Sequence, residues 1–327
     1  MAALRLITSH GADLDPKQWD AFIEASPQGA VFLYHGYMRI VSPGWKCLIV
    51  KEGDCWKAVL PFADSTRMGL RRSLQPRFAQ YWGVCFAPTD RRGYHKISHQ
   101  KAILELMIPA VSEFRQIVWN FSPACSYVLP FYWAGFRLNN RYTYQIHLER
   151  EEAELLSDMA PTTRRYIRKG ANLSVSESFD TTAFLSLFAR QKAHQHEIIS
   201  SHVEEHIRLK ALVEYLCEKG KGKLILVKNS EGQVLAGGLF GFANQTCTYL
   251  LGTYDPDQAN RSAMPLMMWH MIRHSKQQGL NVFDFEGSMM KGVERFFRRM
   301  GGQPVPYLRI EKNELPLLIQ WILALRS

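Results

Sequence analysis

The sequence predicts a fold of the α/β (α+β) class in which one domain, a mixed sheet with helices on both faces, occurs twice in tandem. Segments with the period of a strand alternate along the chain with segments that have the period of a helix. The order of these segments in the first half is repeated in the second half, at a spacing of about 160 residues. The 327 residues are enough for two such domains, each with its own core. A repeat of this length indicates two copies of one domain rather than a solenoid of short repeats.

Each half begins with a hairpin pattern, continues with a strand that ends before a loop containing Pro and Asp, and then has a helix and another strand. In the first half these segments are 44–50 with 57–63, 80–87, 102–114 and 117–121. In the second half they are 223–228 with 234–242, 246–254, 264–277 and 282–285. The repeat continues beyond them, since 131–136 corresponds to 296–302 and the strand 142–148 corresponds to the strand 307–310.

The boundary between the two copies is predicted near Glu149, where the charged stretch 149–154 begins. The first domain is therefore expected to span 1–148 and the second 149–311. A C-terminal helix, 312–327, is expected to join the first domain. Its run 315–325 is apolar almost all round, which is typical of a buried helix, and contact with a membrane surface is the alternative.

A helix with a basic face is predicted from 155 to 169. Its basic residues are Arg164, Arg165, Arg168 and Lys169. Such a face either binds phosphate groups or is simply solvated, and the sequence leaves both interpretations open.

Composition indicates a globular protein with an acidic partner. Apolar residues make up 46% of the chain, charged residues make up 21%, and the formal net charge is +10. The positive charge would attract nucleic acid, a nucleotide-linked substrate or an anionic membrane surface. No secretory signal and no apolar stretch of about 18 residues is present. The six cysteines form no C-x-x-C pair, which fits a reducing compartment, so we expect a cytoplasmic protein without a membrane span.

Several familiar chemistries have no motif in the chain. It lacks a phosphate loop, a G-x-G-x-x-G fingerprint and a G-x-S-x-G elbow. Residues 202–206 spell H-x-x-E-H, but no third zinc ligand is placed with them. The loop 257–263, before the helix 264–277, has no glycine to close around a pyrophosphate. The sequence therefore predicts no cofactor and no metal site, and it argues against acetyl-CoA binding at that loop.

The stretch 282–307 is the strongest candidate for a site. A strand that carries Asp284 ends at Glu286 and Gly287, and an amphipathic helix follows from 291 to 300. The acids either form structural ion pairs with the helix arginines or border a ligand cleft, because the end of a strand in an α/β domain is where ligands bind.

These residues resemble a known family. The tandem unit, TYLLGTYD at 248–255, the Asp284 strand, FFRRMGG at 296–302 and SPQGAVFLYHGY at 26–37 are similar to FemABX-type members of the acetyltransferase (GNAT) superfamily. The resemblance covers nearly the whole chain and implies two tandem GNAT-like domains. It also implies a bacterial enzyme that transfers an amino acid from aminoacyl-tRNA onto an amine of a peptidoglycan precursor of the cell wall.

The resemblance also implies roles for individual residues. The family's motif lysine falls on Arg298, which would stabilise the oxyanion of the reaction as a fixed cation. Asp284 and Glu286 would shape the acceptor site. The aromatic residues Tyr249, Tyr254 and Phe297 would contact the substrate in the cleft. Arg39 and Gln195 stand near positions that hold phosphate in the family. The basic helix could replace those two contacts through Arg164, Arg165, Arg168 and Lys169.

Three functions remain open from the sequence. The first is an aminoacyltransferase, with aminoacyl-tRNA as donor and a nucleotide- or lipid-linked amine as acceptor. The second is an acyl-CoA-dependent N-acyltransferase acting on the amine of a lipid, a sugar or an amino acid. The third is a basic RNA-binding module without catalysis, whose affinity would fall steeply with salt.

Overall fold

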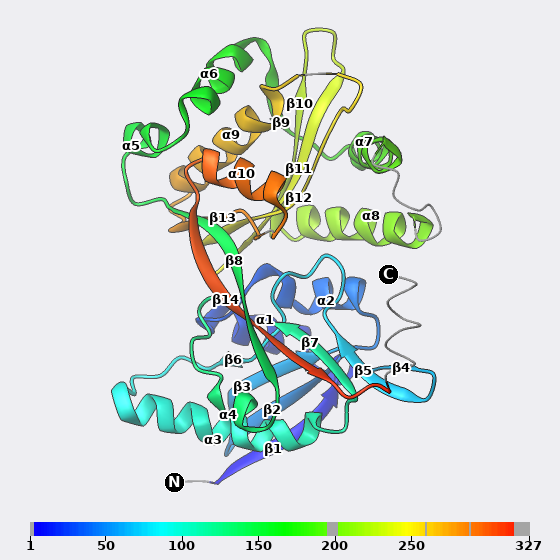
Figure 1. The fold of residues 1–327 in the computed structure, drawn as a ribbon, viewed down its shortest axis with the longest axis vertical. Coiled ribbons are helices and arrows are strands. Elements are labelled where there is room, and N and C mark those ends of the chain that lie inside the picture. Colours follow the sequence, from blue (N-terminus) through cyan, green and yellow to red (C-terminus); the bar gives the residue numbers. More distant parts are fainter. Residues whose placement is uncertain (1–2, 195–201, 259, 288, 317–327) are drawn as a thin grey trace. The chain divides into compact units, whose positions relative to one another are not determined.

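The computed structural model describes residues 3–194, 202–258, 260–287 and 289–316 (Figure 1). The chain divides into two compact units, which are described separately: unit 1 comprises 1–141 and 306–327, and unit 2 comprises 142–305. The strands β8 (Arg137–His147) and β14 (Gln303–Asn313) contribute residues to both units. The expected helix 312–327 does not begin at 312, because Lys312 and Asn313 pair with β7 as the end of β14. Residues 317–327 lie outside the described residues.

Unit 1 consists of two sheets with helices packed against them. Its first sheet has the strand order β1-β2-β3-β6, and its second has the order β4-β5-β7-β14. The strands of unit 1 are β1 (Leu4–His10), β2 (Lys46–Glu52), β3 (Cys55–Phe62), β4 (Ser65–Arg67), β5 (Leu70–Leu74), β6 (Cys85–Phe86) and β7 (Gln116–Asn120). The helices are α1 (Pro16–Ala25), α2 (His35–Val41), α3 (Gly93–Val111) and α4 (Leu129–Trp133).

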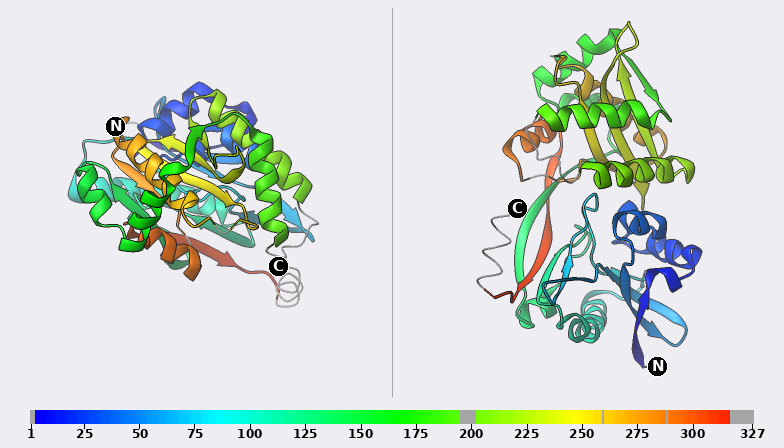
Figure 2. Two further views of the ribbon diagram at one scale, coloured as in Figure 1. Left: turned by 90° about the horizontal axis from the view of Figure 1, so that it is seen from above. Right: turned by 90° about the vertical axis from the view of Figure 1, so that its right-hand side faces the viewer.

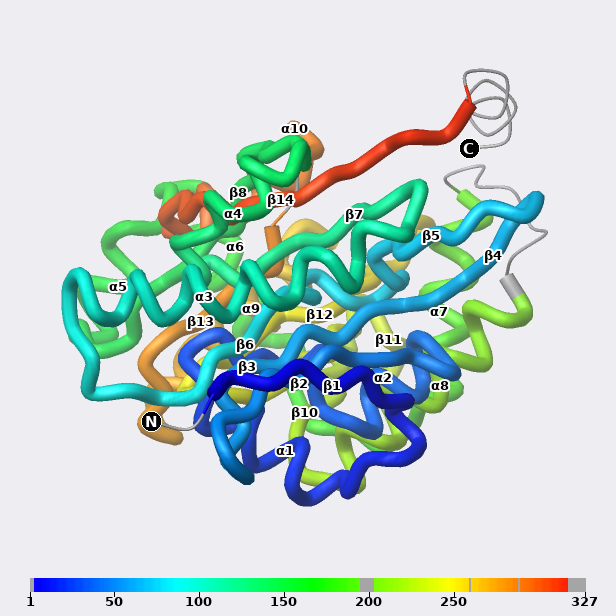
Figure 3. Tube along the Cα trace, turned by 90° about the horizontal axis from the view of Figure 1, so that it is seen from below, coloured from blue at the N-terminus to red at the C-terminus, as the bar shows by residue number. Residues whose placement is uncertain are grey.

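The hydrophobic core of unit 1 lies between its sheets and α3. Alternate residues of β2, Leu48 and Val50, belong to one buried cluster with Ile103 and Leu104 of α3. Figure 3 shows the strands β1 to β3 between α3 on one side and α1 on the other. The period of two in the strands thus separates the residues that meet α3 from those that meet α1.

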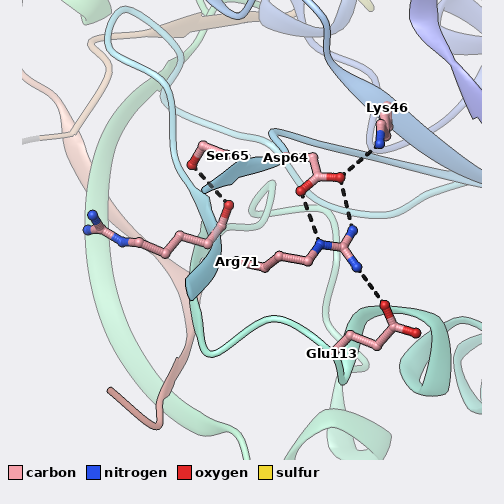
Figure 4. A network of polar contacts seen from close by, with 6 residues as sticks. Lys46, Asp64, Ser65, Arg71 and Glu113 are labelled. Carbon is pink, nitrogen blue, oxygen red and sulfur yellow. Dashed lines mark hydrogen bonds and ion pairs between the residues drawn. The ribbon is translucent and has the colours of Figure 1, made fainter. Parts of the chain in front are cut away.

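A polar network fixes the hairpin β4–β5 to its neighbours in unit 1 (Figure 4). The Asp64 carboxylate accepts hydrogen bonds from Lys46 Nζ at 2.9 Å and from Arg71 Nη2 at 2.9 Å. Arg71 Nη1 donates to Glu113 at 2.5 Å, and its guanidinium lies 4.5 Å above the centre of the Phe114 ring. Burial by itself would raise the pKa of Asp64, but the hydrogen bonds from Arg71 and Lys46 outweigh it and lower that pKa. The network is therefore structural.

Unit 2 is built on one mixed sheet. The strand order is β8-β13-β12-β11-β10-β9, in which β12 and β13 are parallel and the other pairs are antiparallel. The further strands are β9 (Ser174–Glu177), β10 (Gly222–Lys228), β11 (Val234–Ala243), β12 (Thr246–Tyr254) and β13 (Val282–Asp284). The helices are α5 (Glu152–Ser157), α6 (Pro161–Lys169), α7 (Thr181–His194), α8 (His202–Glu218), α9 (Ala263–Gln277) and α10 (Lys291–Arg299).

Helices cover both faces of this sheet. A side chain at Gly237 would meet Phe184 of α7 at 2.7 Å, whereas a side chain at the next residue, Gly238, would meet Met267 of α9 at 2.8 Å. Because neighbouring residues of a strand face opposite ways, α7 and α9 lie on opposite faces. Figure 2 shows α8 beside α7. The glycines allow both helices to approach the strand closely.

The predicted fold class is confirmed, and two further expected elements differ from the structure. The expected strand 80–87 is reduced to the two residues of β6, since only Cys85 and Phe86 pair with β3. The expected helix 155–169 is broken into α5 and α6 at Pro161, which lacks an N–H donor and disfavours helical backbone at Ala160. In the part of the chain that the structure describes, no helix is long and apolar enough to cross a membrane.

Candidate functional site

The sheet of unit 2 opens between its two parallel strands. β12 and β13 pair over three residues only, and the pairing ends at Thr248 and Asp284. β12 then continues to Tyr254, and it bulges at Leu250, because Tyr249 is opposite Phe240 while Leu251 is opposite Leu239. A bulge bends the strand and increases its twist. Past Thr248, one edge of β12 is therefore no longer occupied by β13.

Asp284 is the last residue of β13, and both oxygens of its buried carboxylate accept hydrogen bonds. Only 3% of the residue is exposed. Its oxygens accept hydrogen bonds from Thr143 Oγ1 at 2.5 Å, from Gln145 Nε2 at 2.9 Å and from the backbone N–H of Glu286 at 2.8 Å. Asp284 thus joins β13 to β8 and fixes the backbone of Glu286, so it positions the second acid.

Glu286 is held in an unusual conformation beside the opening. Its φ of 56° lies in the left-handed region, which a residue with a side chain rarely adopts without support from its surroundings. Burial, and then the nearby charge of Asp284, raise the pKa of the Glu286 carboxyl well above its ordinary value. At Gly287 any side chain would come within 1.9 Å of the Tyr142 carbonyl oxygen, so only glycine permits this approach to β8.

Tyr249, a residue of β12, lies near Glu286. Its ring contacts Phe240 and Phe297 at centroid distances of 5.4 Å and 6.3 Å. Burial, and then the charge of Glu286, raise the pKa of the Tyr249 hydroxyl. A side chain at Gly252 would lie 1.5 Å from the Tyr249 hydroxyl oxygen, so Gly252 leaves the space that this ring occupies.

A cavity of about 470 Å³ lies where β12 ends and α9 begins. It is lined by residues of four regions, α6, the end of β12 with the following loop, the start of α9, and α10: Thr163, Tyr166, Tyr254, Asp255, Pro256, Gln258, Asn260, Arg261, Met264, Pro265, Phe296 and Arg299. All of these residues belong to unit 2. Tyr254, which the sequence predicted to bind substrate, is 45% exposed and forms part of the wall.

The cavity wall contains two arginines and a buried aspartate that is paired with a third arginine. Arg261 and Arg299 are cations of the wall, and hydrogen bonding to Arg261 lowers the pKa of the Tyr166 hydroxyl. Asp255 is buried and forms an ion pair with Arg190, which holds the end of β12 against α7. Burial of Asp255 opposes ionisation, but the hydrogen bond from Arg190 outweighs it and lowers the pKa of Asp255.

The start of α9 is already occupied by a side chain. Asn260 Oδ1 accepts hydrogen bonds from the backbone N–H groups of Ser262 at 2.9 Å and of Ala263 at 3.1 Å. These are amides of the kind that would otherwise bind an anion at the beginning of a helix.

Neighbouring residues of α10 have different surroundings in the structure, although the sequence analysis grouped them in one motif. Arg298 has a side chain that is 62% exposed and pairs with Glu294 at 2.8 Å, whereas Arg299 lines the cavity. Phe297 is only 3% exposed and packs against Phe285, whereas Phe296 lines the cavity. The structure therefore places Phe297 in the core, and it places Arg298 on the outer side of the helix.

The remaining predicted residues lie at varied positions. Arg164, Arg165, Arg168 and Lys169 are on α6, the helix that gives Thr163 and Tyr166 to the cavity. Arg39 is exposed on α2 of unit 1, and Gln195 lies outside the described residues. His202 and His206 are on α8, and among the residues that the structure describes no group of three or more His, Cys, Asp or Glu is arranged to hold a metal ion.

The sequence did not single out Tyr166, Arg261 and Arg299 for this site. Arg299 differs by one position from the predicted Arg298, which is a rotation of about 100° on a helix. Tyr166 and Arg261 are far apart in the chain, and only the contact of α6 with α9 brings them together. A local pattern carries no signal of that contact.

Comparisons with known proteins agree on the fold. The family model described as acetyltransferase (GNAT) domain matches residues 157–298, which lie within unit 2. Among solved structures, the crystal structure of FemX is 13% identical with a TM-score of 0.69, and the match covers 97% of this chain and 99% of that one. No curated protein sequence matches the chain significantly.

Two further structures are similar over nearly the whole chain. The C-terminal domain of a putative lysylphosphatidylglycerol synthetase from Agrobacterium fabrum is 12% identical, with a TM-score of 0.59 and coverage of 93% of both chains. A tandem GNAT protein from the clavulanic acid biosynthesis pathway is 10% identical, with a TM-score of 0.55 and coverage of 96% of this chain and 99% of that one. The chain therefore has a tandem GNAT-type acyltransferase fold like that of FemX, and the predicted resemblance is confirmed at the level of the fold.

Proposed function

We propose that unit 2 catalyses the transfer of an aminoacyl or acyl group from an activated donor onto an amine. The observation that carries this proposal is the carboxyl of Glu286, held in left-handed backbone beside the open edge of β12. Such a group is suited to proton transfer, because its pKa is raised by burial and by Asp284 towards the range in which a general base works best.

The amine must lose a proton when it attacks. In the proposed reaction a new bond forms between the amine nitrogen and the acyl carbon, and the bond from that carbon to the donor's oxygen or sulfur breaks. Glu286 takes the proton from the amine, and the leaving group of the donor takes up a proton in turn. Asp284 acts through Glu286, because its hydrogen bond to the Glu286 N–H fixes where that carboxyl lies.

The donor is proposed to extend from the cavity to the opening. From Tyr254, in the wall of the cavity, to Tyr249, beside Glu286, β12 runs for five residues, or roughly 17 Å. The anionic part of the donor would bind Arg261 and Arg299, and its reactive end would reach Glu286 along the edge of β12. The residues that bind the donor in the cavity would then differ from the residue that takes part in the transfer, Glu286.

Aminoacyl-tRNA is the donor that the site supports best. The basic helix α6 borders the cavity and offers Arg164, Arg165, Arg168 and Lys169 to a polyanion such as RNA. The start of α9, where a pyrophosphate would otherwise bind, is taken by Asn260. An acyl-CoA donor is the second candidate, and the match to the acetyltransferase family model over 157–298 favours it.

The two arginines at the end of α10 have different proposed roles. The family resemblance implies that Arg298, which is paired with Glu294, stabilises the oxyanion, whereas Arg299, in the cavity wall, is proposed to bind the anionic part of the donor. The acceptor is proposed to be an amine linked to a nucleotide or a lipid, such as a cell-wall precursor, which suits the net charge of +10. A cytoplasmic location remains a prediction, and it would agree with a donor that is a charged tRNA.

The test is mass spectrometry of a mixture of amine acceptors incubated with the protein and either charged tRNA or acyl-CoA. We expect an acceptor whose mass grows by one aminoacyl residue, only with charged tRNA and only with the intact Glu286 side chain. If the mass of an acceptor instead increases by an acyl group with acyl-CoA alone, the donor is acyl-CoA, the second candidate. Binding of many RNAs without any product would overturn it in favour of a binding module.

A further inference from the structure

Unit 1 has a cavity of its own, which the proposed reaction does not use. It lies where the short strand β6 ends and α3 begins, the place that corresponds in the repeat to the cavity of unit 2. Its volume is about 110 Å³. The lining residues come from β3, α3 and the loops before and after β6: Pro27, Gln28, Lys57, Phe86, Ala87, Pro88, Thr89, Arg91, Lys96, His99, Gln100 and Ile103.

The titratable residues that line this cavity are all basic. Its described wall contains Lys57, Arg91, Lys96 and His99, and it contains no Asp or Glu. Lys57 is held at one side by an ion pair with Glu52 at 3.3 Å. Like charges that share a small space repel one another, and an anion that binds among them reduces this repulsion.

The wall between these cations is fixed by hydrogen bonds. Gln28 is buried, and its side chain accepts from the Phe86 N–H at 3.0 Å and donates to the Ala124 carbonyl at 3.1 Å. The Ala87 N–H donates to the Lys57 carbonyl at 2.8 Å, and the Arg91 N–H donates to Thr89 Oγ1 at 3.2 Å. The backbone that carries Lys57 and Arg91 therefore does not need to reorganise when a ligand enters.

We propose that this cavity binds a phosphoryl group. The volume is that of between three and four water molecules, which admits a tetrahedral oxyanion and leaves the rest of a larger ligand outside. Arg91 supplies a planar fork of donors that matches phosphate oxygens, and Lys57 and Lys96 supply point charges. The site shares no residue with the proposed acyl-transfer site, since all of its residues belong to unit 1.

The first test is equilibrium binding of pyrophosphate to the whole protein by isothermal titration calorimetry. Arg91→Ala and Lys96→Ala should each weaken binding roughly tenfold, the value of one charge-assisted hydrogen bond. Arg92→Ala is the matched control, because Arg92 is the next residue and does not line the cavity. It should change affinity less than about twofold.

All three side chains are partly or largely exposed, so their variants should fold, and circular dichroism checks this. If the wild-type protein does not bind pyrophosphate, or if Arg92→Ala weakens binding as much as Arg91→Ala, the assignment is overturned.

The second test uses pH, with sulfate as the probe because its charge does not change near neutrality. Burial, and then the charge of Arg91, lower the pKa of His99; Glu52 opposes this shift and Lys57 adds to it. A bound anion favours protonated His99, so sulfate should bind more tightly as pH falls from about 7.5 to about 5.5. His99→Gln should remove this dependence, and an unchanged pH dependence in that variant would contradict the place of His99 in the site.

The third test identifies where the phosphoryl group comes from. Pyrophosphate, a nucleoside diphosphate and vesicles of phosphatidylglycerol are compared on the wild-type protein and on Arg91→Ala. The source is the probe that binds most tightly to the wild type and loses most in Arg91→Ala. Equal binding of every probe to both proteins would overturn the proposal. None of these measurements uses the transfer reaction, so the outcome is independent of the proposed function.

Discussion

The two units differ at the same place in the repeat. In unit 2 the pairing of β12 with β13 ends at Thr248 and Asp284, two residues before Glu286. In unit 1 the corresponding space beside β7 is filled with aromatic side chains, since Trp82, Trp119 and Phe121 are completely buried. A side chain at Gly83 would lie 2.3 Å from the Phe121 ring. In unit 1 this position therefore belongs to the core, whereas in unit 2 the pairing of the two strands ends there beside Glu286.

The residues that end the two strands show how the difference arises. When the ends of β7 and β13 are aligned, Asn120 corresponds to Asp284, Phe121 to Phe285, and Ser122 to Glu286. The aromatic residue is common to both units, and the two acids occur only in unit 2. The fold alone therefore does not distinguish the two units. The carboxyls of Asp284 and Glu286 do, and they are the residues to which we assign the proposed reaction.

The largest effect is expected from Glu286→Gln. The substitution keeps the size of the side chain and removes the proton acceptor, so kcat should fall by about 10² to 10⁴. Steady-state transfer to the acceptor found by mass spectrometry measures it. Glu152→Gln, which changes an acid on α5 that pairs with Arg273, is the control and should retain full activity. Equal activity of Glu286→Gln and the wild type would remove the functional difference between the two units.

The raised pKa of Glu286 gives a second expectation for the same variant. Only the carboxylate accepts a proton, so kcat/KM of the wild type should rise with pH through the raised pKa, in excess of any rise due to the amine. The folded state favours the protonated acid, so the contribution of Glu286 to folding stability is fully present below the ordinary Glu pKa of about 4.3 and is lost as pH rises through the raised value. Urea denaturation at several pH values measures it as the difference in stability between the wild type and Glu286→Gln, which should shift against the wild type as pH rises.

In unit 1 a substitution at Phe121, which corresponds to Phe285, should affect stability and not catalysis. Phe121→Ala removes a completely buried ring that packs on Phe131 at a centroid distance of 5.6 Å. The cost is expected to be about 3 to 5 kcal/mol, measured by urea denaturation. Transfer per folded molecule should not change. A loss of kcat in the folded fraction would mean that unit 1 takes part in the reaction through this position.

The sequence was informative wherever a local pattern decides the structure. It identified the strand that carries Asp284, with Glu286 just beyond its end, and the helix stop at Gly301, whose φ of 88° is left-handed. It did not show which face of α10 borders the cavity, because neighbouring residues of a helix point about 100° apart: Arg299 lines the cavity, and Arg298 pairs with Glu294. The cavity itself depends on the packing of α6 against α9, and no period in either helix specifies its partner.

The next comparison is between the neighbours Arg299 and Arg298. Arg299→Ala should raise the KM for the donor roughly tenfold with little change in kcat, because Arg299 lines the cavity. Arg298→Ala should leave stability almost unchanged, since its pair with Glu294 is an exposed pair within one helix. A drop in kcat of about 10² or more for Arg298→Ala, with Arg299→Ala nearly normal, would instead support the oxyanion role that the resemblance implies for Arg298.

The smallest effect concerns the helices that follow β12 and β6. Asn260 accepts from two amides at the start of α9, whereas Arg92 at the start of α3 makes no such bond with its side chain. Asn260→Ala should therefore cost about 1 kcal/mol of stability, and Arg92→Ala should cost almost nothing. Thermal or urea denaturation measures both variants.

Asn260→Ala also separates the two donors, because it frees the N–H groups of Ser262 and Ala263 for an anion. If Asn260 is what keeps acyl-CoA from this position, the variant should bind CoA more tightly than the wild type, while transfer from charged tRNA keeps its kcat. If the wild type already binds CoA and Asn260→Ala weakens that binding, the side chain is part of a CoA site, and the cavity of unit 2 would then hold acyl-CoA.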